Sequence, residues 1–349
     1  MPHNRYLPFL QIITMRMRAC FVIQTFFMKM KSLFLYITCL AGLILMTGCN
    51  IRQQRSLPAQ KNTATPSISK NTTPSAVPNE NELLLGVQAR SALQLPPNRQ
   101  WFDSIYNGYK VDTATANSLR QLWRTKKIDI FFGTWCGDSR REVPRMLKIL
   151  DNCGVPANKI RLVLLDYRHP LYKASPTHEE RGKNIFRVPT LIISENKEGD
   201  TYSEIGRIVE YPVTTLEKDM MSILNGEAYT PNYKAGAYLL PLLQNGYLSD
   251  TSADLQGLVV KIKPLVKNVA ELNSLGSVLQ SAQETVKAAM VFRLNTLLYP
   301  QEPEPWNNLG HTYFRKGEKE KAREYYSQAL QIAPDNAFAR KMLDSLQVR

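Results

Sequence analysis

The spacing of hydrophobic residues along the middle of the chain predicts helices and short buried strands in alternation. Apolar side chains recur at helical spacing over residues 112–124. Asp112, at the start of this range, is suited to cap a helix. Compact apolar runs at 128–132 and 160–166 are typical of buried strands. Between them, residues 139–150 carry a single apolar stripe, which predicts a helix.

A polar stretch then separates this group of elements from a second one. Residues 167–187 are mostly polar, and we expect one short helix there, near Glu179–Lys183. Strands are expected from Pro189 to Ile193 and from Tyr202 to Val209, followed by a helix at 214–224. The resulting order of elements, α-β-α-β-α-β-β-α, predicts an α/β domain.

The last third of the chain changes to helices alone, with a period of about 34 residues. One copy of the pattern consists of Trp306, Leu309, Gly310, Tyr313, Ala322, Tyr326, Ala329 and Pro334. The spacing resembles the tetratricopeptide repeat, or TPR. The resemblance implies repeats at about 269–302 and 303–336, a capping helix at 337–347, and an all-α domain over 231–349. Residues 231–268 are expected to be helical without forming a third repeat.

The N-terminus has the layout of a secretory signal. Residues 1–48 contain five basic side chains and no acidic one, and an apolar run from Leu33 to Met46 follows two lysines. Met46-Thr47-Gly48-Cys49 resembles a bacterial lipobox. The resemblance implies that residues 1–48 form a signal peptide and that Cys49 is lipidated. The alternative is a transmembrane anchor, although the apolar run is shorter than the roughly 20 residues that a spanning helix needs.

A start at Met28 or Met30 would give a signal of ordinary length, which would make the printed start over-long. Residues 49–80 would then contain the lipidated cysteine and a polar linker, which is predicted to be disordered. These features predict a cell-envelope protein that is anchored to a membrane by lipid and faces the periplasm. The formal charge of +14 is scattered rather than interleaved with aromatic side chains, so nucleic acid is not an expected partner.

The candidate chemistry lies in Trp135-Cys136-Gly137-Asp138-Ser139 and, later in the chain, in Val188-Pro189-Thr190. Together these motifs resemble the redox centre and the cis-proline loop of the thioredoxin superfamily. The resemblance implies a thioredoxin-like α/β fold over 95–227, with a central mixed sheet flanked by helices. It further implies that Cys136 is the nucleophile, that Trp135 walls the site, and that the proline loop holds an extended substrate.

Two departures from the family pattern concern the second half of the redox cycle. Ser139 stands where the family usually has a resolving cysteine. Ile130 stands where typical thioredoxins carry a buried carboxylate, and strand alternation directs the neighbouring Asp129 to the other face. A mixed disulfide at Cys136 would therefore need a second thiol from outside for its release.

Neighbouring groups in the sequence have opposite effects on the thiolate form of Cys136. A helix N-terminus favours the thiolate, and so would Arg140 and Arg141, whereas Asp138 opposes it. Cys153 is not an expected partner, because the intervening helix separates the two cysteines by some 25 Å. No cofactor is expected, and no metal site is expected because His169 and His178 lack further ligands at suitable spacing.

Two functions follow from these patterns. The first is monothiol thiol–disulfide exchange or redox homeostasis through Cys136, as an oxidoreductase or isomerase with a single active-site cysteine. Its substrates would be proteins or low-molecular-weight thiols and disulfides, and the TPR repeats would bind a protein partner. The alternative is a non-catalytic thioredoxin-like and TPR scaffold tethered to the membrane.

Overall fold

The computed structural model describes residues 83–199, 201–249 and 254–347. All of these residues belong to one compact unit of the chain. The expected signal peptide, Cys49 and the linker through residue 80 lie outside the described residues. Within the described ranges, no helix is long and apolar enough to cross a membrane.

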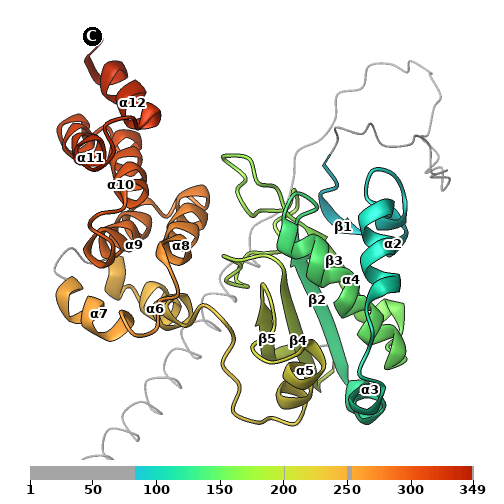
Figure 1. Cartoon of the computed structure of the whole chain (residues 1–349). Coiled ribbons are helices and arrows are strands. Elements are labelled where there is room, and N and C mark those ends of the chain that lie inside the picture. Colours follow the sequence, from blue (N-terminus) through green and yellow to red (C-terminus); the bar gives the residue numbers. More distant parts are fainter. Residues whose placement is uncertain (1–82, 200, 250–253, 348–349) are drawn as a thin grey trace, which may run out of the picture. The chain divides into compact units, whose positions relative to one another are not determined.

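The first half of the described chain contains a mixed, five-stranded sheet (Figure 1). Its strand order is β1-β3-β2-β4-β5. β2 and β3 are parallel, and the other neighbouring pairs are antiparallel. The strands are β1 (Gly86–Gln88), β2 (Lys126–Phe132), β3 (Ile160–Leu164), β4 (Thr190–Glu198) and β5 (Thr201–Val209). The mixed α/β architecture agrees with the prediction, and β2 to β5 correspond to the four predicted strands.

β1 is a strand that the hydrophobic pattern did not predict. It has only three residues, and it pairs with β3 at the edge of the sheet. Leu93, which follows it, is fully buried in the core. The expected domain start at residue 95 therefore leaves out residues that belong to the sheet and its core.

Four helices accompany the sheet: α2 (Arg99–Gly108), α3 (Thr113–Leu119), α4 (Gly137–Asn152) and α5 (Leu216–Leu224). Asp112 caps α3 as expected, because its carboxylate accepts hydrogen bonds from the backbone N–H groups of Ala114 and Thr115. The α-helix ends at Leu119, earlier than predicted, and a 3₁₀ turn continues to Trp123.

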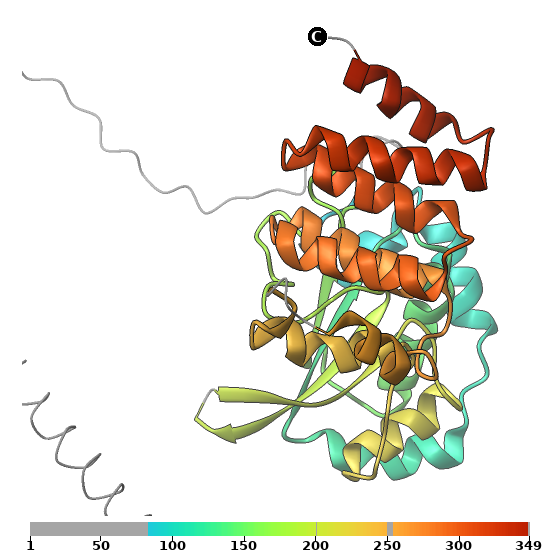
Figure 2. The same ribbon diagram turned by 90° about the vertical axis from the view of Figure 1, so that its left-hand side faces the viewer.

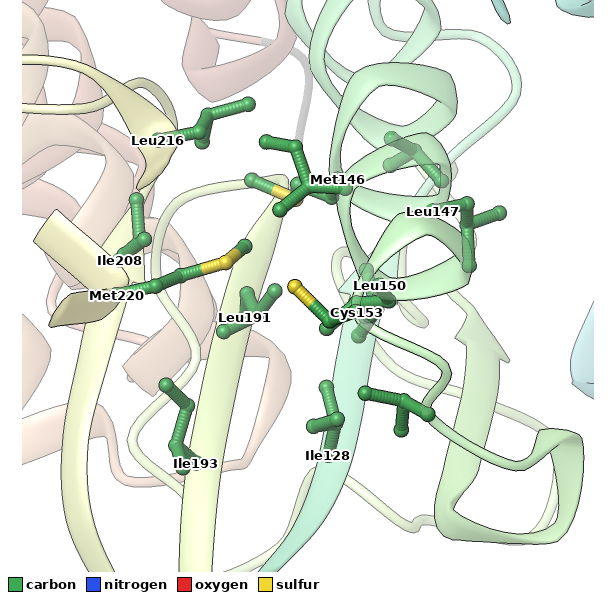
Figure 3. Close-up of a cluster of buried hydrophobic side chains, with 14 of the residues drawn as sticks. Ile128, Met146, Leu147, Leu150, Cys153, Leu191, Ile193, Ile208, Leu216 and Met220 are labelled. Carbon is green, nitrogen blue, oxygen red and sulfur yellow. The ribbon is translucent and has the colours of Figure 1, made fainter. Parts of the chain in front are cut away.

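One face of the sheet forms the main core with these four helices. Alternate residues of the strands, such as Ile128, Ile130 and Leu191, point into it, as the two-residue period of a strand requires. Figure 3 shows Cys153 among these side chains, with its sulfur directed toward the space between α4 and the strands. Cys153 is thus a core residue.

The opposite face of the sheet is covered differently. Phe131, Val163 and Ile192 form a smaller buried cluster there, and Ile185 and Val188 from irregular backbone pack on it. The sequence predicted helices flanking the sheet, but the residues that cover this cluster do not come from a helix.

The helix expected near Glu179–Lys183 is also absent, and this prediction was wrong. The segment forms turns, and His178, Gly182 and Asn184 adopt left-handed backbone conformations with φ of 59°, 72° and 56°. A right-handed helix cannot pass through such residues.

The second half of the described chain is entirely helical, as predicted. Its elements are α6 (Lys234–Gln244), α7 (Leu255–Ile262), α8 (Val269–Ser281), α9 (Thr285–Leu298), α10 (Pro303–Arg315), α11 (Lys319–Ile332) and α12 (Ala337–Gln347). α10 begins 34 positions after α8, and α11 begins 34 positions after α9. Figure 2 shows α8 to α12, in orange to red, as successive layers.

The two helix pairs use the same packing at the same repeat position. A Cβ atom on Gly276 of α8 would lie 2.4 Å from the Phe292 ring of α9. A Cβ atom on Gly310 of α10 would lie 2.9 Å from the Tyr326 ring of α11. Both rings are fully buried. Each glycine therefore provides the space for the aromatic ring of its partner helix.

Candidate functional site

Cys136 lies between the end of β2 and the start of α4. It has extended backbone geometry and is the N-cap residue of the helix, which Gly137 begins. Its thiol is partly exposed and donates a hydrogen bond to the carbonyl oxygen of Val188, with a sulfur–oxygen distance of 3.4 Å. The structure therefore brings together the two motifs that the sequence analysis selected.

Trp135 directly precedes Cys136, and both residues pack against the smaller buried cluster of the sheet. The indole N–H of Trp135 donates to the carbonyl of Leu165 at 2.8 Å, and its ring packs near Tyr167 at a centroid distance of 5.7 Å. Gly133 makes room for the indole, because a Cβ atom there would lie 2.2 Å from Trp135 Nε1. The position of the Trp135 indole therefore requires a glycine at residue 133.

Ser139 and Ile130 are both fully buried. Ser139 lies one helical turn after Cys136, and its hydroxyl oxygen accepts from the N–H of Gly133 at 3.4 Å. Ile130 is in the main core, whereas Asp129 forms a two-point ion pair with Arg161. Asp129 therefore has a partner of its own.

The charged residues in the first turn of α4 have partners other than the thiol. Arg140 Nε donates to the carbonyl of Thr134 at 2.5 Å. Arg141 pairs with Asp138 at 2.7 Å and with the buried Glu142 at 2.6 Å. The expectation that these arginines assist Cys136 directly is therefore not supported by the contacts that they make.

The loop at residues 187–190 is held by hydrogen bonds on both sides of its proline. The Val188–Pro189 peptide bond is cis. The hydroxyl of Thr190, which is buried, donates to the carbonyl of Arg187 at 2.7 Å. The N–H of Glu210, just after β5, donates to the carbonyl of Pro189 at 2.7 Å. The end of β5 thus fixes the loop that Cys136 contacts.

Three charged residues were not selected by the sequence analysis: Arg187, which begins this loop, and Lys173 and Glu210, which lie beside it. Arg187 forms an ion pair with Glu210 at 3.4 Å. Burial raises the pKa of the Glu210 carboxyl, and Arg187 opposes this effect. Burial lowers the pKa of Lys173 to about 7, and the adjacent positive charge of Arg187 lowers it further.

Only Arg187 left a signal in the sequence, because it directly precedes the Val188-Pro189-Thr190 motif. Lys173 and Glu210 are buried charges in irregular segments, and hydrophobic periodicity carries no information about them. A buried carboxyl does lie near the thiol site, but it comes from the residue after β5 and not from β2.

Cys153 is placed too deep to serve as a second thiol. It is buried, and its thiol donates to the carbonyl of Ala116 with a sulfur–oxygen distance of 3.4 Å. Burial raises the pKa of this thiol. Cys136 and Cys153 are the free cysteines of the described residues. In this same part of the chain, no three His, Cys, Asp or Glu side chains are grouped so that they could hold a metal ion.

Comparison with known proteins identifies one segment of the chain. Residues 303–336, which comprise α10 and α11, match the family model described as the tetratricopeptide repeat. Residues 303–336 form a TPR. The match covers a small part of the chain, at the position of the second predicted repeat.

The chain is similar to the crystal structure of the Sgt2 TPR domain from Aspergillus fumigatus, with 17% sequence identity and a TM-score of 0.23. The similarity covers 33% of this chain and 74% of the Sgt2 domain, and a score this low supports no structural inference. No curated protein matches the chain.

Proposed function

We propose that Cys136 carries out monothiol thiol–disulfide exchange in a thioredoxin-like domain. The observation that carries the proposal is the position of the thiol at the start of α4, in contact with the carbonyl of Val188. A thiol in this place is partly exposed and lies beside a loop with backbone groups that an extended substrate can pair with.

The proposed reaction needs one thiol from the protein and one from outside. The Cys136 thiolate attacks one sulfur of a substrate disulfide, which forms a mixed disulfide and releases the other sulfur as a thiolate. A second thiolate, from the substrate or from a small molecule, then attacks the substrate sulfur and releases Cys136. Ser139 has no sulfur, so Cys136 and residue 139 cannot close a disulfide between them.

The TPR supports a separate role in binding a protein partner, because such repeats provide extended helical surfaces. We place the thioredoxin-like domain at about 84–227, earlier than residue 95 because β1 and Leu93 belong to its sheet and core. The helical domain would cover 231–349, with the first repeat at 269–302. The matching starts of the two helix pairs support that assignment.

Trapping of mixed disulfides tests the exchange reaction. Cells that produce the full chain are quenched with acid, alkylated, and analysed for disulfide adducts by non-reducing electrophoresis and mass spectrometry. We expect adducts at Cys136 that disappear in Cys136→Ser and persist in the matched control Cys153→Ser. If the parent chain yields no adduct at Cys136 under mild oxidative stress, the exchange proposal is wrong.

The second candidate is a non-catalytic scaffold, which the TPR match favours. In that case Cys136→Ser would leave both the partner proteins and the phenotype of the cell unchanged. Loss of the last repeat would remove the partners in either case, so the cysteine variant separates the two functions.

The membrane anchor is proposed from the lipobox-like sequence Met46-Thr47-Gly48-Cys49. The same cell preparations test it, because lipidation at Cys49 would place the protein in the membrane fraction. We expect Cys49→Ser to abolish labelling by a radioactive fatty acid. Persistent labelling of that variant would contradict the assignment of the anchor.

A further inference from the structure

Tyr167 is an exposed aromatic residue at the same edge of the sheet as Cys136. β2 and β3 are parallel neighbours, and their last residues, Phe132 and Leu164, are paired in the register. Cys136 is the fourth residue after Phe132, and Tyr167 is the third residue after Leu164. Because neighbouring parallel strands lie about 4.8 Å apart and end at the same edge of a sheet, both residues follow the sheet at that edge.

Asp166 fixes the backbone on both sides of Tyr167. The N–H of Asp166 donates to the carbonyl of Ala174 at 2.9 Å, and its own carbonyl accepts from the N–H of Lys173 at 2.7 Å. The buried Asp166 carboxylate accepts from the N–H of Arg168 at 2.9 Å and pairs with the Arg168 guanidinium at 2.6 Å. Tyr167 is nevertheless 49% exposed. The fold therefore presents this ring to solvent from a backbone that is held in place.

The Tyr167 ring extends an aromatic surface that begins at the residue before Cys136. Its centroid lies 5.7 Å from that of Trp135, at an interplanar angle of 53°. Trp135 and Cys136 pack against the same buried cluster. Consecutive Cα atoms are about 3.8 Å apart, and an extended chain advances about 3.3–3.6 Å per residue. A substrate with its cysteine at Cys136 can therefore place a residue about two to four positions away against Tyr167.

Charged side chains close to Cys136 and Tyr167 in the fold have partners within the protein. Three ion pairs are formed there: Asp166–Arg168, Asp138–Arg141 and Arg187–Glu210. Arg140 is directed toward α2, with its Cζ 5.9 Å from the Trp101 ring. An ion pair offers little to a charged ligand, whereas an exposed ring gains free energy when an apolar side chain covers it. The partner that fits Tyr167 is therefore an uncharged apolar or aromatic side chain.

We propose that Tyr167 is a specificity-determining residue, which binds an apolar side chain close to the disulfide of a protein substrate. This inference rests on the proposed exchange function of Cys136 and deepens it, because it selects proteins over low-molecular-weight disulfides. A small disulfide reaches the thiol without extending to Tyr167, so it gains nothing from the ring.

Single-turnover reactions with three kinds of disulfide test this role. Each carries 2-nitro-5-thiobenzoate, joined through sulfur to 2-mercaptoethanol, to a polar cysteine peptide, or to peptides with one phenylalanine at successive positions from the cysteine. The Cys136 thiolate attacks the sulfur of the peptide or of mercaptoethanol, the disulfide bond breaks, and 2-nitro-5-thiobenzoate leaves as a thiolate. The rate at Cys136 of the full-length chain is followed by mass spectrometry of its peptide after acid quenching.

The parent should react about threefold faster or more with the best phenylalanine peptide than with the polar peptide, because an aromatic contact forms. Tyr167→Ser should lose this preference and keep the parent rate with the mercaptoethanol reagent. Tyr167→Phe should keep the preference, because the ring remains. Tyr238→Ser removes another exposed tyrosine, on α6, and as the matched control it should behave like the parent.

Tyr167→Glu keeps the test decisive if Tyr167→Ser does not fold, as judged by circular dichroism. The glutamate variant should lose the preference for phenylalanine. At low salt it should instead favour a peptide with lysine at the same position, because exposed opposite charges attract most strongly when they are not screened. An unchanged preference for phenylalanine in this variant would overturn the role of Tyr167.

The outcomes also separate this inference from the exchange function. A parent chain without preference for any phenylalanine peptide would overturn the role of Tyr167. So would a Tyr167→Ser chain that is slower by the same factor with every reagent, because that result indicates a structural effect on the thiol. Both results leave the exchange function in place, since Cys136 still reacts. A parent Cys136 that reacts with no reagent would overturn the exchange function and the substrate class with it.

Discussion

Ser139 is the residue at which the site departs most clearly from a dithiol centre. It is the third residue of α4, and Cys136 is the N-cap of the same helix. Side chains three positions apart on a helix are neighbours, with Cβ atoms about 5–6 Å apart. The buried Ser139 hydroxyl accepts a hydrogen bond from the N–H of Gly133, and a hydroxyl group cannot form a disulfide.

This geometry predicts the behaviour of Ser139→Cys. The variant should form a disulfide between residues 136 and 139 under mild oxidation, because small adjustments bring the two sulfur atoms together. Peptide mass spectrometry and thiol titration would measure it. Ser139→Ala is the matched control, with no disulfide. A variant that folds but keeps both thiols reduced would show that the motif geometry is incorrect.

At the scale of elements, the helix pairs α8–α9 and α10–α11 depend on two glycines that face aromatic rings. Gly276 meets Phe292 and Gly310 meets Tyr326 at equivalent repeat positions. The rings are fully buried and have little space into which they could move. Helix propensity would favour alanine over glycine by about 1 kcal/mol, so packing and propensity act in opposite directions here.

We expect packing to outweigh propensity in Gly276→Ala. Overpacking of a well-filled core costs about 1–3 kcal/mol, so the free energy of unfolding should fall. Gly310→Ala should lose less, because its Cβ contact distance is 2.9 Å rather than 2.4 Å. Urea unfolding followed by circular dichroism would measure both, with Ser277→Ala on α8 as control. An increase in stability for Gly276→Ala would contradict the packing shown in the structure.

At the scale of the whole described molecule, Lys173 connects the stability of the fold to pH. Its pKa is lowered from the ordinary value of 10.5 to about 7 in the folded protein. The unfolded chain therefore binds more protons than the folded chain between these pH values. The free energy of unfolding is therefore highest, as far as Lys173 is concerned, above pH 10.5, and it decreases as the pH falls toward 7.

The free energy of unfolding should accordingly rise more steeply with pH in the parent than in Lys173→Met. The difference in slope between pH 7 and 9 should approach about 1.4 kcal/mol per pH unit, the value for one proton. Urea unfolding at several pH values would measure both slopes. Equal slopes for the two proteins would mean that Lys173 is not buried as a titrating group.

Local interactions account for what could be predicted. The positions of β2 to β5 and the Asp112 cap followed from hydrophobic spacing and helix capping, and the start of each repeat followed from the 34-residue pattern. Ile130 is buried, and Cys136 contacts the carbonyl of Val188. The candidate role of Cys136 stays a prediction, as does the lipid anchor at Cys49.

The failures have a different physical origin. β1 is too short to show a period, and it is stabilised by pairing with β3, far along the chain. The helix expected near Glu179–Lys183 is replaced by turns because three nearby residues have left-handed geometry. Neither feature depends on local side-chain spacing, so neither could be read from the hydrophobic pattern.

The sequence by itself determined the helical repeat, the strands of the central sheet and the presence of a single thiol at a helix start. These features arise from periodic burial and from backbone preferences that act over a few residues. Tertiary structure alone decided that Lys173, Glu210 and Ser274 gather beside the loop at residues 187–190. Burial of charged groups depends on contacts between segments up to about a hundred residues apart, as between Lys173 and Ser274. No local pattern encodes such contacts. Burying a charge costs desolvation energy, and that cost is offset only by partners that the tertiary fold brings to the charge.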